Sequence, residues 1–219
     1  MNNNNIYSKV FMWLFIGLLV TFGVGYLTLL LAYNNASFAS LIFSNGSYWV
    51  IFIAEIIVAM VLGVKVYKLP GNTVKALYIG YCALTGLTFS AIFAIFNLTS
   101  IIYVFLVTSL ILGAFSWLGK SLKIDLRKIG IYLLMSLIGI IILELINIFW
   151  ANSALNMFAC IVSIIVFMIY ISYDIQKIDR LMTTNIPEEN IAIMGAFNLY
   201  LDFINIFINL LKIFGKNRD

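Results

Sequence analysis

The stretch "FNLYLDFINIFINL", residues 197–210, has the composition of a membrane-spanning helix but carries an aspartate in its middle. Small and polar residues recur around this aspartate at intervals of three and four positions, which places them on one side of an α-helix. They are Gly195, Asn198, Asp202, Asn205 and Asn209. A charged side chain at the centre of a bilayer costs ~3 kcal/mol or more. An acid at this position therefore needs a partner or a wet cavity.

The whole chain has the composition of an integral membrane protein. Of its 219 residues, 63% are hydrophobic and 10% are charged, and the mean hydropathy is +1.08. Soluble domains are about 45–50% apolar and about 25% charged. Apolar stretches long enough to cross a hydrocarbon core of about 30 Å recur along the chain. We therefore expect one transmembrane domain, residues 1–219, with no separate soluble domain.

The residue types that are missing or dispersed exclude several kinds of site. The chain has no histidine, which removes the usual zinc ligand and the usual sensor of neutral pH. Cys82 and Cys160 lie in apolar stretches without a C-x-x-C pattern, so we expect both to be packing residues. The net charge of +4 comes from basic residues spread over several connections, so no binding of nucleic acid is expected. No cofactor is predicted.

Seven hydrophobic segments predict an all-α protein with seven transmembrane helices. The segments cover residues 10–33, 49–64, 74–96, 101–118, 129–150, 153–178 and 191–214. The first apolar run is longer than the hydrophobic part of a signal peptide, so we expect it to remain as a helix.

Positive charge alternates between successive connections. Basic residues precede the first helix and occupy the second, fourth and sixth connections, whereas the first, third and fifth contain none. The residues are Lys9; Lys65, Lys68 and Lys75; Lys120, Lys123, Arg127 and Lys128; and Lys177 and Arg180. The positive-inside rule therefore predicts a cytoplasmic N-terminus.

The C-terminus departs from this rule. A seventh crossing would place Lys212, Lys216 and Arg218 outside, so the last segment either crosses against the rule or re-enters without crossing. Its length favours a crossing.

Four of the nine acids fall within or at the edge of hydrophobic segments, and intramembrane acids are candidates for a functional site. They are Glu55, Glu144, Asp174 and Asp202. Glu55 and Glu144 lie in the outer halves of their helices, where they could reach interfacial water. Asp174 lies at the cytoplasmic end of the sixth helix and could also face water. Asp202, by contrast, lies ~17 Å along its helix from the first apolar residue.

The sixth and seventh helices are consecutive, so we expect them to be antiparallel neighbours. If the sixth helix continues through "DIQKI", Asp174 reaches the level of Asp202, and Ser163 and Tyr170 share its face. Two carboxyl groups within hydrogen-bonding distance cannot easily both ionise, so they would titrate as a unit. Protonated, the pair would lock the two helices together; ionised, it would repel itself and attract cations. The spacing therefore predicts a proton-controlled gate.

The oxygen atoms near this pair suit a hard cation. Calcium takes about 6–8 oxygen ligands, and Asn198, Asn205 and Asn209 supply amide oxygens on the same stripe. Two acids and a few amides are too few for a tight cage, which favours a transient calcium site along a pathway. Protons and monovalent cations would suit such a path as well.

Several stretches of this chain resemble the Bax inhibitor family, also called the transmembrane Bax inhibitor motif proteins, and in particular its bacterial calcium-leak members. "NLYLDFINIFINLLKIFG", residues 198–215, is very similar to the C-terminal helix of the family. "IYISYDIQKI", residues 169–178, resembles the preceding helix, and "ALTGLTFSAIF", residues 83–93, resembles the third. Glu55 in "IAEIIVAM" matches an acidic position in the second helix.

This resemblance implies a bundle of six helices around a central seventh, in a bacterial plasma membrane, with an organelle membrane left open. It also implies a pH-sensitive calcium leak channel with Asp174 and Asp202 as a di-aspartyl sensor. Calcium is then the permeant ion. We expect Asp174, Asp202 and Glu55 to bind it transiently, and Glu55 and, more weakly, Glu144 to attract cations from the outer side.

Two further features of the family apply to this chain as expectations. In some members a basic residue at the cytoplasmic end of the second helix latches onto the aspartate of the sixth, and Lys65 and Lys68 are the candidates here. Lysine cannot make the bidentate contact that arginine makes with a carboxylate. Other bacterial relatives modulate a membrane-bound protease, so an interaction protein is the alternative function.

Two classes with related layouts do not fit. Presenilin-like aspartyl proteases carry their second aspartate in G-x-G-D, but here Leu199 and Leu201 occupy the glycine positions and a Pro-Ala-Leu motif is missing. Rhodopsins need a lysine in the middle of the seventh helix, whereas Lys212 and Lys216 lie at its far end. We therefore expect a protein that is not an enzyme and carries no retinal.

Overall fold

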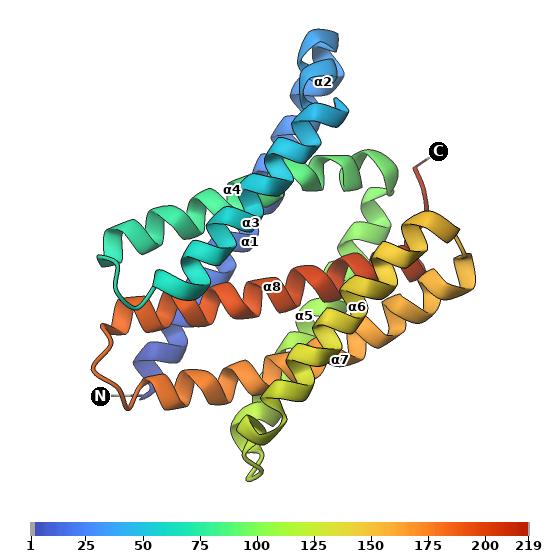
Figure 1. Cartoon of the computed structure of the whole chain (residues 1–219). Coiled ribbons are helices and arrows are strands. Elements are labelled where there is room, and N and C mark those ends of the chain that lie inside the picture. The colour runs from blue at the N-terminus through green and yellow to red at the C-terminus, as the bar shows by residue number, and fades with distance from the viewer. Residues whose placement is uncertain (1–2, 219) are drawn as a thin grey trace. The chain divides into compact units, whose positions relative to one another are not determined.

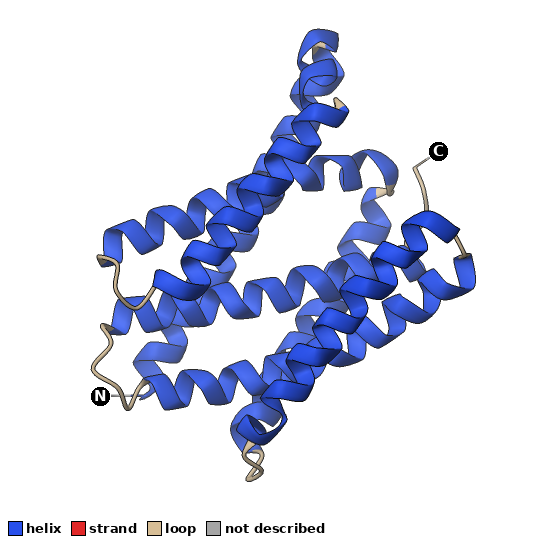
Figure 2. Cartoon of the chain, viewed as in Figure 1, coloured by secondary structure: helices blue, strands red, loops and turns tan. Residues whose placement is uncertain are grey.

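A computed structural model describes residues 3–218 of the chain, and nearly all of them are helical (Figure 1, Figure 2). The α-helices are α1 (Asn3–Asn34), α2 (Ala36–Ile42), α3 (Asn45–Lys65), α4 (Gly71–Ile95), α5 (Leu98–Ser121), α6 (Gly130–Trp150), α7 (Ser153–Leu181) and α8 (Glu188–Phe214), and a 3-10 turn, η1 (Leu126–Ile129), precedes α6. The only β-type pairing in the described part is an isolated bridge between Phe96 and Asn217. The predicted all-α class is confirmed.

Seven of these helices are long and apolar enough to cross a membrane. All except α2 contain candidate spans of 20 to 30 residues with a mean hydropathy of 1.6 to 2.6. Each predicted hydrophobic segment coincides with one of them apart from a few residues at the ends. The chain is therefore a seven-helix membrane protein.

The short helix α2 was not predicted, because its seven residues carry no transmembrane signal. It begins after Asn35, whose side-chain oxygen accepts a hydrogen bond of 3.1 Å from the backbone N–H of Phe38. Ser44 caps α3 in the same way, by accepting from the N–H of Ser47 at 3.2 Å. Capping side chains thus extend helical structure into a connection whose composition reads as a loop.

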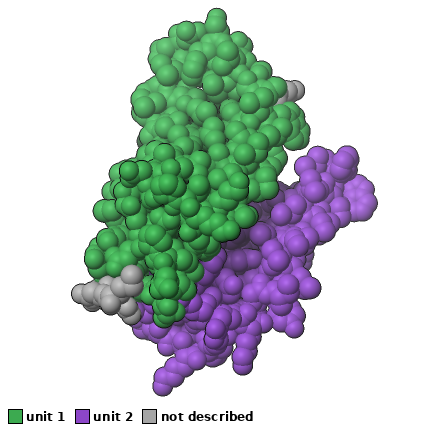
Figure 3. Space-filling view, turned by 60° about the vertical axis from the view of Figure 1, so that its left-hand side comes forward, with its two compact units in different colours: residues 1–98, 181–197, 217–219 green, residues 99–180, 198–216 purple. Residues whose placement is uncertain are grey.

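The chain divides into two compact units (Figure 3). Unit 1 comprises residues 1–98, 181–197 and 217–219, and unit 2 comprises residues 99–180 and 198–216. Helix α8 contributes its first part to unit 1 and its remainder to unit 2. It is also the most buried helix, since 78% of its most apolar stretch is buried against 6–39% in the other six spans.

In unit 1, α1 and α4 approach so closely that a side chain is excluded at one point. A Cβ atom on Gly86 would lie 2.9 Å from the carbonyl oxygen of Thr21 and 2.7 Å from Cβ of Val24. The Tyr78 hydroxyl donates to the carbonyl oxygen of Trp13 at 3.0 Å. This bond joins the same two helices at a second level. These contacts make α1 and α4 a fixed pair.

The first turn of α8 attaches to this pair through charged and polar side chains. Glu188 pairs with Lys9 of α1 at 3.2 Å, and Glu189 pairs with Lys75 of α4. The amide nitrogen of Asn190 donates to the carbonyl oxygens of Val66 at 2.7 Å and Leu69 at 2.9 Å, in the connection between α3 and α4.

The segments at the two ends of α8 both contact α4. Helix α8 begins beside the start of α4, as the Lys75–Glu189 pair requires. After α8, the backbone N–H of Arg218 donates to the carbonyl oxygen of Ile95 at 2.8 Å, at the end of α4. The chain is therefore beside the start of α4 where α8 begins, and beside the end of α4 after α8 has ended.

In unit 2, α5 and α7 are held together around a glycine. A Cβ on Gly119 would lie 2.7 Å from Cα and from the carbonyl oxygen of Ser172. The Ser172 hydroxyl donates to the carbonyl oxygen of Phe115 at 2.8 Å, and Gln176 accepts from the N–H of Leu126 at 2.9 Å. This packing fixes the part of α7 that leads to Asp174.

Candidate functional site

Asp174 of α7 and Asp202 of α8 lie together in the interior of unit 2. Asp174 is 5% exposed and Asp202 is 3% exposed. Their carboxyl groups are close enough to interact directly with each other. Because α7 continues without interruption to Leu181, Asp174 stays on a helix rather than in a water-exposed connection. The two acids that the spacing singled out are thus brought into contact.

The surroundings of the pair are unequal. Asp174 accepts a hydrogen bond of 3.0 Å from the amide nitrogen of Asn198, and the ammonium of Lys177 lies 4.0 Å from the same oxygen. Oδ2 of Asp202 is buried and has no hydrogen-bond partner in the described part of the chain. Tyr170 lies within electrostatic range of both carboxyl groups. One carboxyl is therefore well supplied with donors, and the other is not.

The charge balance at the pair favours a shared proton. The ammonium of Lys177 is in ion-pair range of Asp174, and Arg180 acts on the same carboxyl group electrostatically. Two ionised carboxylates side by side in a low-dielectric interior still repel each other, which is strongly unfavourable. Retaining one proton between the two groups relieves this repulsion and supplies a hydrogen bond.

The asparagines of α8 present oxygen atoms to unit 2. The side-chain nitrogen of Asn205 donates to the carbonyl oxygen of Leu201 at 2.8 Å, and that of Asn209 donates to the carbonyl oxygen of Asn205 at 2.8 Å. One hydrogen of each amide is used within the helix, and the carbonyl oxygen of each amide is the acceptor that can face another partner. Oδ1 of Asn209 and Oγ of Ser163 are both buried and unpartnered among the described residues.

The other predicted acids have separate environments. Glu55 of α3 belongs to unit 1, where the Thr88 hydroxyl of α4 lies 3.5 Å from its Oε1. Glu144 of α6 belongs to unit 2, where its Oε1 lies 3.8 Å from the ammonium of Lys212 at the end of α8.

The predicted latch residues lie in unit 1. Lys65 ends α3, and the backbone N–H of Lys68 donates to its carbonyl oxygen at 2.9 Å in the turn that follows. Within residues 3–218 neither lysine makes an ion pair, and the cation recorded beside Asp174 is Lys177. The latch stays a prediction.

The described residues contain no cluster of side chains typical of a permanent metal site. Within them, no three histidine, cysteine, aspartate or glutamate side chains are placed to hold a metal ion together. A cation at the aspartate pair would have to complete its coordination with amide oxygens and water. This is the ligand set expected of a transient site.

Two contributors were not singled out by the sequence. Lys177 follows Asp174 by three positions, and this helical spacing could have indicated the ion pair. Asn190 directly precedes the apolar part of α8 and gives no such signal, because its partners are backbone carbonyls more than a hundred residues away.

The comparisons with known proteins agree with this architecture. Residues 3–219 match the family described as "Inhibitor of apoptosis-promoting Bax1". The chain is 38% identical to the inner membrane protein YbhL of Escherichia coli K12, over 96% of this chain and 91% of that protein. It is 34% identical to a protein of Borreliella burgdorferi (99% and 94%) and 30% identical to a membrane protein of Streptococcus pyogenes serotype M3 (98% and 93%). The chain therefore belongs to the Bax inhibitor family.

Proposed function

We propose that this protein is a pH-sensitive calcium leak channel in which Asp174 and Asp202 form the proton sensor and the cation-attracting gate. One observation carries the proposal: two buried carboxyl groups meet on adjacent membrane-spanning helices, and an oxygen of one of them has no partner. A purely structural polar contact in a membrane helix would be expected to satisfy its buried atoms.

The gate works through the protonation of the pair. With a proton between them, Asp174 and Asp202 form a hydrogen bond that joins α7 to α8. Without it, the two carboxylates repel each other and offer negative charge to a cation. Calcium flux is therefore expected to be greater at pH 8 than at pH 6.

The remaining polar residues extend the path. Asn198, Asn205 and Asn209 supply oxygens along α8, while Glu55 and Glu144 attract cations near the outer surface. In this proposal Lys65 or Lys68 restrains the closed state. Calcium ions and protons are the species handled, and no bound cofactor takes part.

The proposed setting is the plasma membrane of a bacterium. The N-terminus and the lysine-rich connections face the cytoplasm under the positive-inside rule. With seven crossings, the C-terminus lies on the outer side of the membrane. The aspartate gate then lies within the bilayer, on the path of ions from one side of the membrane to the other.

The proposed function is not enzymatic. Leu199, which is fully buried, and Leu201 stand where an intramembrane aspartyl protease has glycines, so a substrate backbone cannot approach Asp202 along this helix. The aspartates then bind protons and cations and do not act on a peptide bond.

Liposomes that hold the purified protein and a calcium-sensitive dye test the proposal. Calcium entry is measured from pH 6 to pH 8 for the wild type and for the Asp174→Asn/Asp202→Asn variant. We expect wild-type entry to rise with pH and the variant to lose this dependence. Absence of flux from well-folded wild-type protein would contradict the channel and favour the alternative, a protein that modulates a membrane-bound protease.

A further inference from the structure

We propose a second polar site in unit 2, at which Ser163 of α7 and Asn209 of α8 together bind a water molecule. The site itself follows from the packing of the two helices. Its role, hydrating the cation on the outer side of the aspartate pair, rests on the proposed channel function.

Both side chains are enclosed and have an oxygen to offer. Ser163 is fully buried and Asn209 is 4% exposed, and neither Ser163 Oγ nor Asn209 Oδ1 has a hydrogen-bond partner within the described residues. A serine or threonine in a helix commonly donates to the carbonyl one turn back, as Thr108 does to Val104 and Ser109 does to Phe105, each at 2.8 Å. The Ser163 hydroxyl makes no such bond.

One hydrogen bond and two longer-range electrostatic interactions indicate how α7 and α8 run past each other. Asp174 bonds to Asn198, Tyr170 lies within electrostatic range of Asp202, and Cys160 lies within electrostatic range of Lys212. Each step back along α7 is matched by an equal step forward along α8, so the two helices keep one antiparallel register over this length.

Ser163 and Asn209 occupy matching positions in this register. Ser163 comes eleven residues before Asp174, and Asn209 comes eleven residues after Asn198. Eleven residues are close to three full turns of an α-helix at about 3.6 residues per turn, so both positions return to the contact face. In this register Ser163 therefore faces Asn209 as Asp174 faces Asn198.

The chemistry of the two side chains selects water. The Asn209 side-chain nitrogen donates to the Asn205 carbonyl, and Oδ1, as a carbonyl oxygen, is an acceptor without a donor among the described residues. Ser163 and Asn209 do not bond each other directly. A water molecule can donate to both oxygens, and buried waters make about 2–4 such bonds. A bare cation is disfavoured, because no acid occupies the site and the ammonium of Lys212 follows Asn209 by three residues.

This position gives the water a part in the path. Asn209 lies two turns beyond Asp202, ~10 Å towards the end of α8, and Asn205 lies between them. A cation leaving the carboxyl groups would thus find a water held in place to replace its missing ligands. The site deepens the proposed gate by adding a hydration step that does not depend on pH.

An experimental structure that resolves ordered water, together with calcium flux, tests the site. We expect a water within hydrogen-bonding distance of Ser163 Oγ and Asn209 Oδ1 in the wild type, and none in the Ser163→Ala/Asn209→Leu variant. That variant should conduct about fivefold less, the factor that corresponds to one lost hydrogen bond, with its pH dependence unchanged. Ser109→Ala is the matched control, because that hydroxyl bonds within its own helix.

Each outcome is distinct from the fate of the channel proposal. A direct Ser163–Asn209 hydrogen bond without water would overturn the water site. A folded double variant with wild-type calcium flux would overturn its role in the path. If the wild-type protein shows the bound water but conducts no calcium, the water site is supported and the channel function is contradicted. The single variants Ser163→Ala and Asn209→Ala provide the same readouts if the double variant does not fold.

Discussion

Units 1 and 2 each place an acid on a membrane-spanning helix, but they give it different neighbours. Glu55 in unit 1 faces the hydroxyl groups of Thr85 and Thr88. Asp202 in unit 2 faces a second acid, Asp174. Hydroxyl groups can donate to an ionised carboxylate, whereas a second carboxylate repels it unless a proton is shared. In the proposed function, the proton is therefore shared by the aspartate pair of unit 2 and not held by Glu55 in unit 1.

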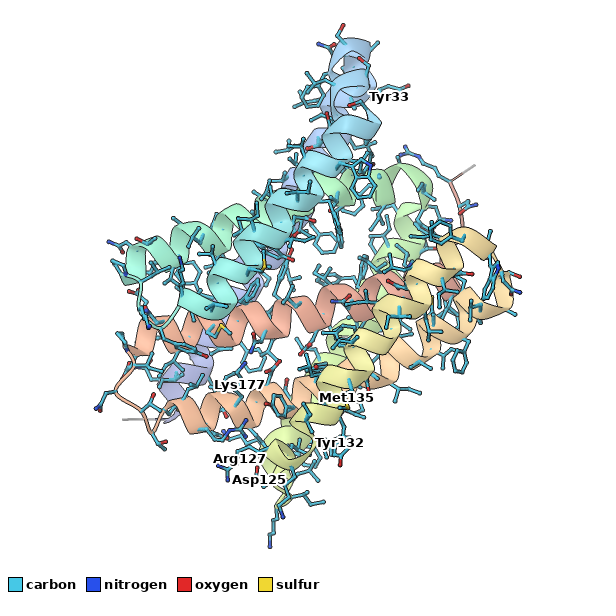
Figure 4. All side chains as sticks on the ribbon, viewed as in Figure 1. Tyr33, Asp125, Arg127, Tyr132, Met135 and Lys177 are labelled. Carbon is cyan, nitrogen blue, oxygen red and sulfur yellow. The ribbon has the colours of Figure 1, made fainter. Side chains whose placement is uncertain are left out.

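Asp125, outside the spans, supplies a third environment. The Arg127 guanidinium and backbone N–H donate to its carboxylate and lower the pKa of Asp125 to about 2 (Figure 4). Because this pKa is depressed, the group is ionised throughout the range from pH 6 to pH 8, and would take up a proton only as the pH falls towards 2. It therefore cannot contribute to a pH-dependent flux in that range.

The largest effect is expected from replacing Asp202 by asparagine. The side chain keeps its size and can still bond to Asp174, but the shared proton and one negative charge are lost. Opposite charges about 4 Å apart attract by about 4 kcal/mol at an effective dielectric of 20, so losing even part of this attraction lowers calcium flux by about tenfold or more. The pH dependence should disappear in the liposome assay.

Glu55→Gln is the matched control for this change. It removes a half-buried acid from unit 1 without touching the aspartate pair. Flux is expected to fall while its dependence on pH remains. If Glu55→Gln abolished the pH dependence and Asp202→Asn preserved it, the contrast between the two units would be reversed.

A smaller effect is expected from Gly119→Ala, which tests how firmly unit 2 positions Asp174. The added methyl would meet the backbone of Ser172, two residues before Asp174, at 2.7 Å. Since backbone cannot move aside as a side-chain end can, we expect the free energy of unfolding to fall by about 1–3 kcal/mol. Thermal unfolding in detergent measures this change.

Gly80→Ala in α4 is the control for the glycine change. A Cβ at Gly80 has no other atom within 4 Å, and alanine has a higher helix propensity than glycine. The stability should stay the same or rise slightly. Equal losses at both positions would show that the close approach of α5 and α7 is not what the Gly119 change disturbs.

The membrane helices and the aspartate pair could be predicted from the sequence because both depend on local patterns. Seven apolar segments of spanning length specify seven helices whatever they pack against. Asp202 stands out because an acid in such a segment is costly. Asp174 follows from the antiparallel arrangement of consecutive helices, which brings its level close to that of Asp202.

The features that could not be predicted depend on contacts between distant segments. Helix α2 depends on a single capping side chain, Asn35, within a connection. The bonds from Asn190 to the α3–α4 connection, and the unpartnered oxygens of Ser163 and Asn209, depend on how helices pack in three dimensions. A spacing of three and four residues identifies the face of a helix but not what that face meets.

The smallest effect is expected from the lysines. Lys65→Ala or Lys68→Ala should raise the basal leak if either lysine restrains the closed state. An exposed ion pair contributes about 1 kcal/mol or less, so the rise should be no more than about fivefold. Calcium entry at a fixed pH measures it, and unchanged leak in both variants would contradict the latch.

Lys177→Ala separates this restraint from control of the proton. Lys177 lies 4.0 Å from Asp174 on the same helix and stabilises its ionised form. Without that cation the pair holds its proton more readily, so the rise of flux should move to higher pH. Replacing a latch lysine should instead change the amount of calcium leak without changing the pH at which the flux rises. If Lys65→Ala or Lys68→Ala moved the pH profile as Lys177→Ala does, the proton would be controlled from unit 1 as well, and the contrast between the units would no longer hold.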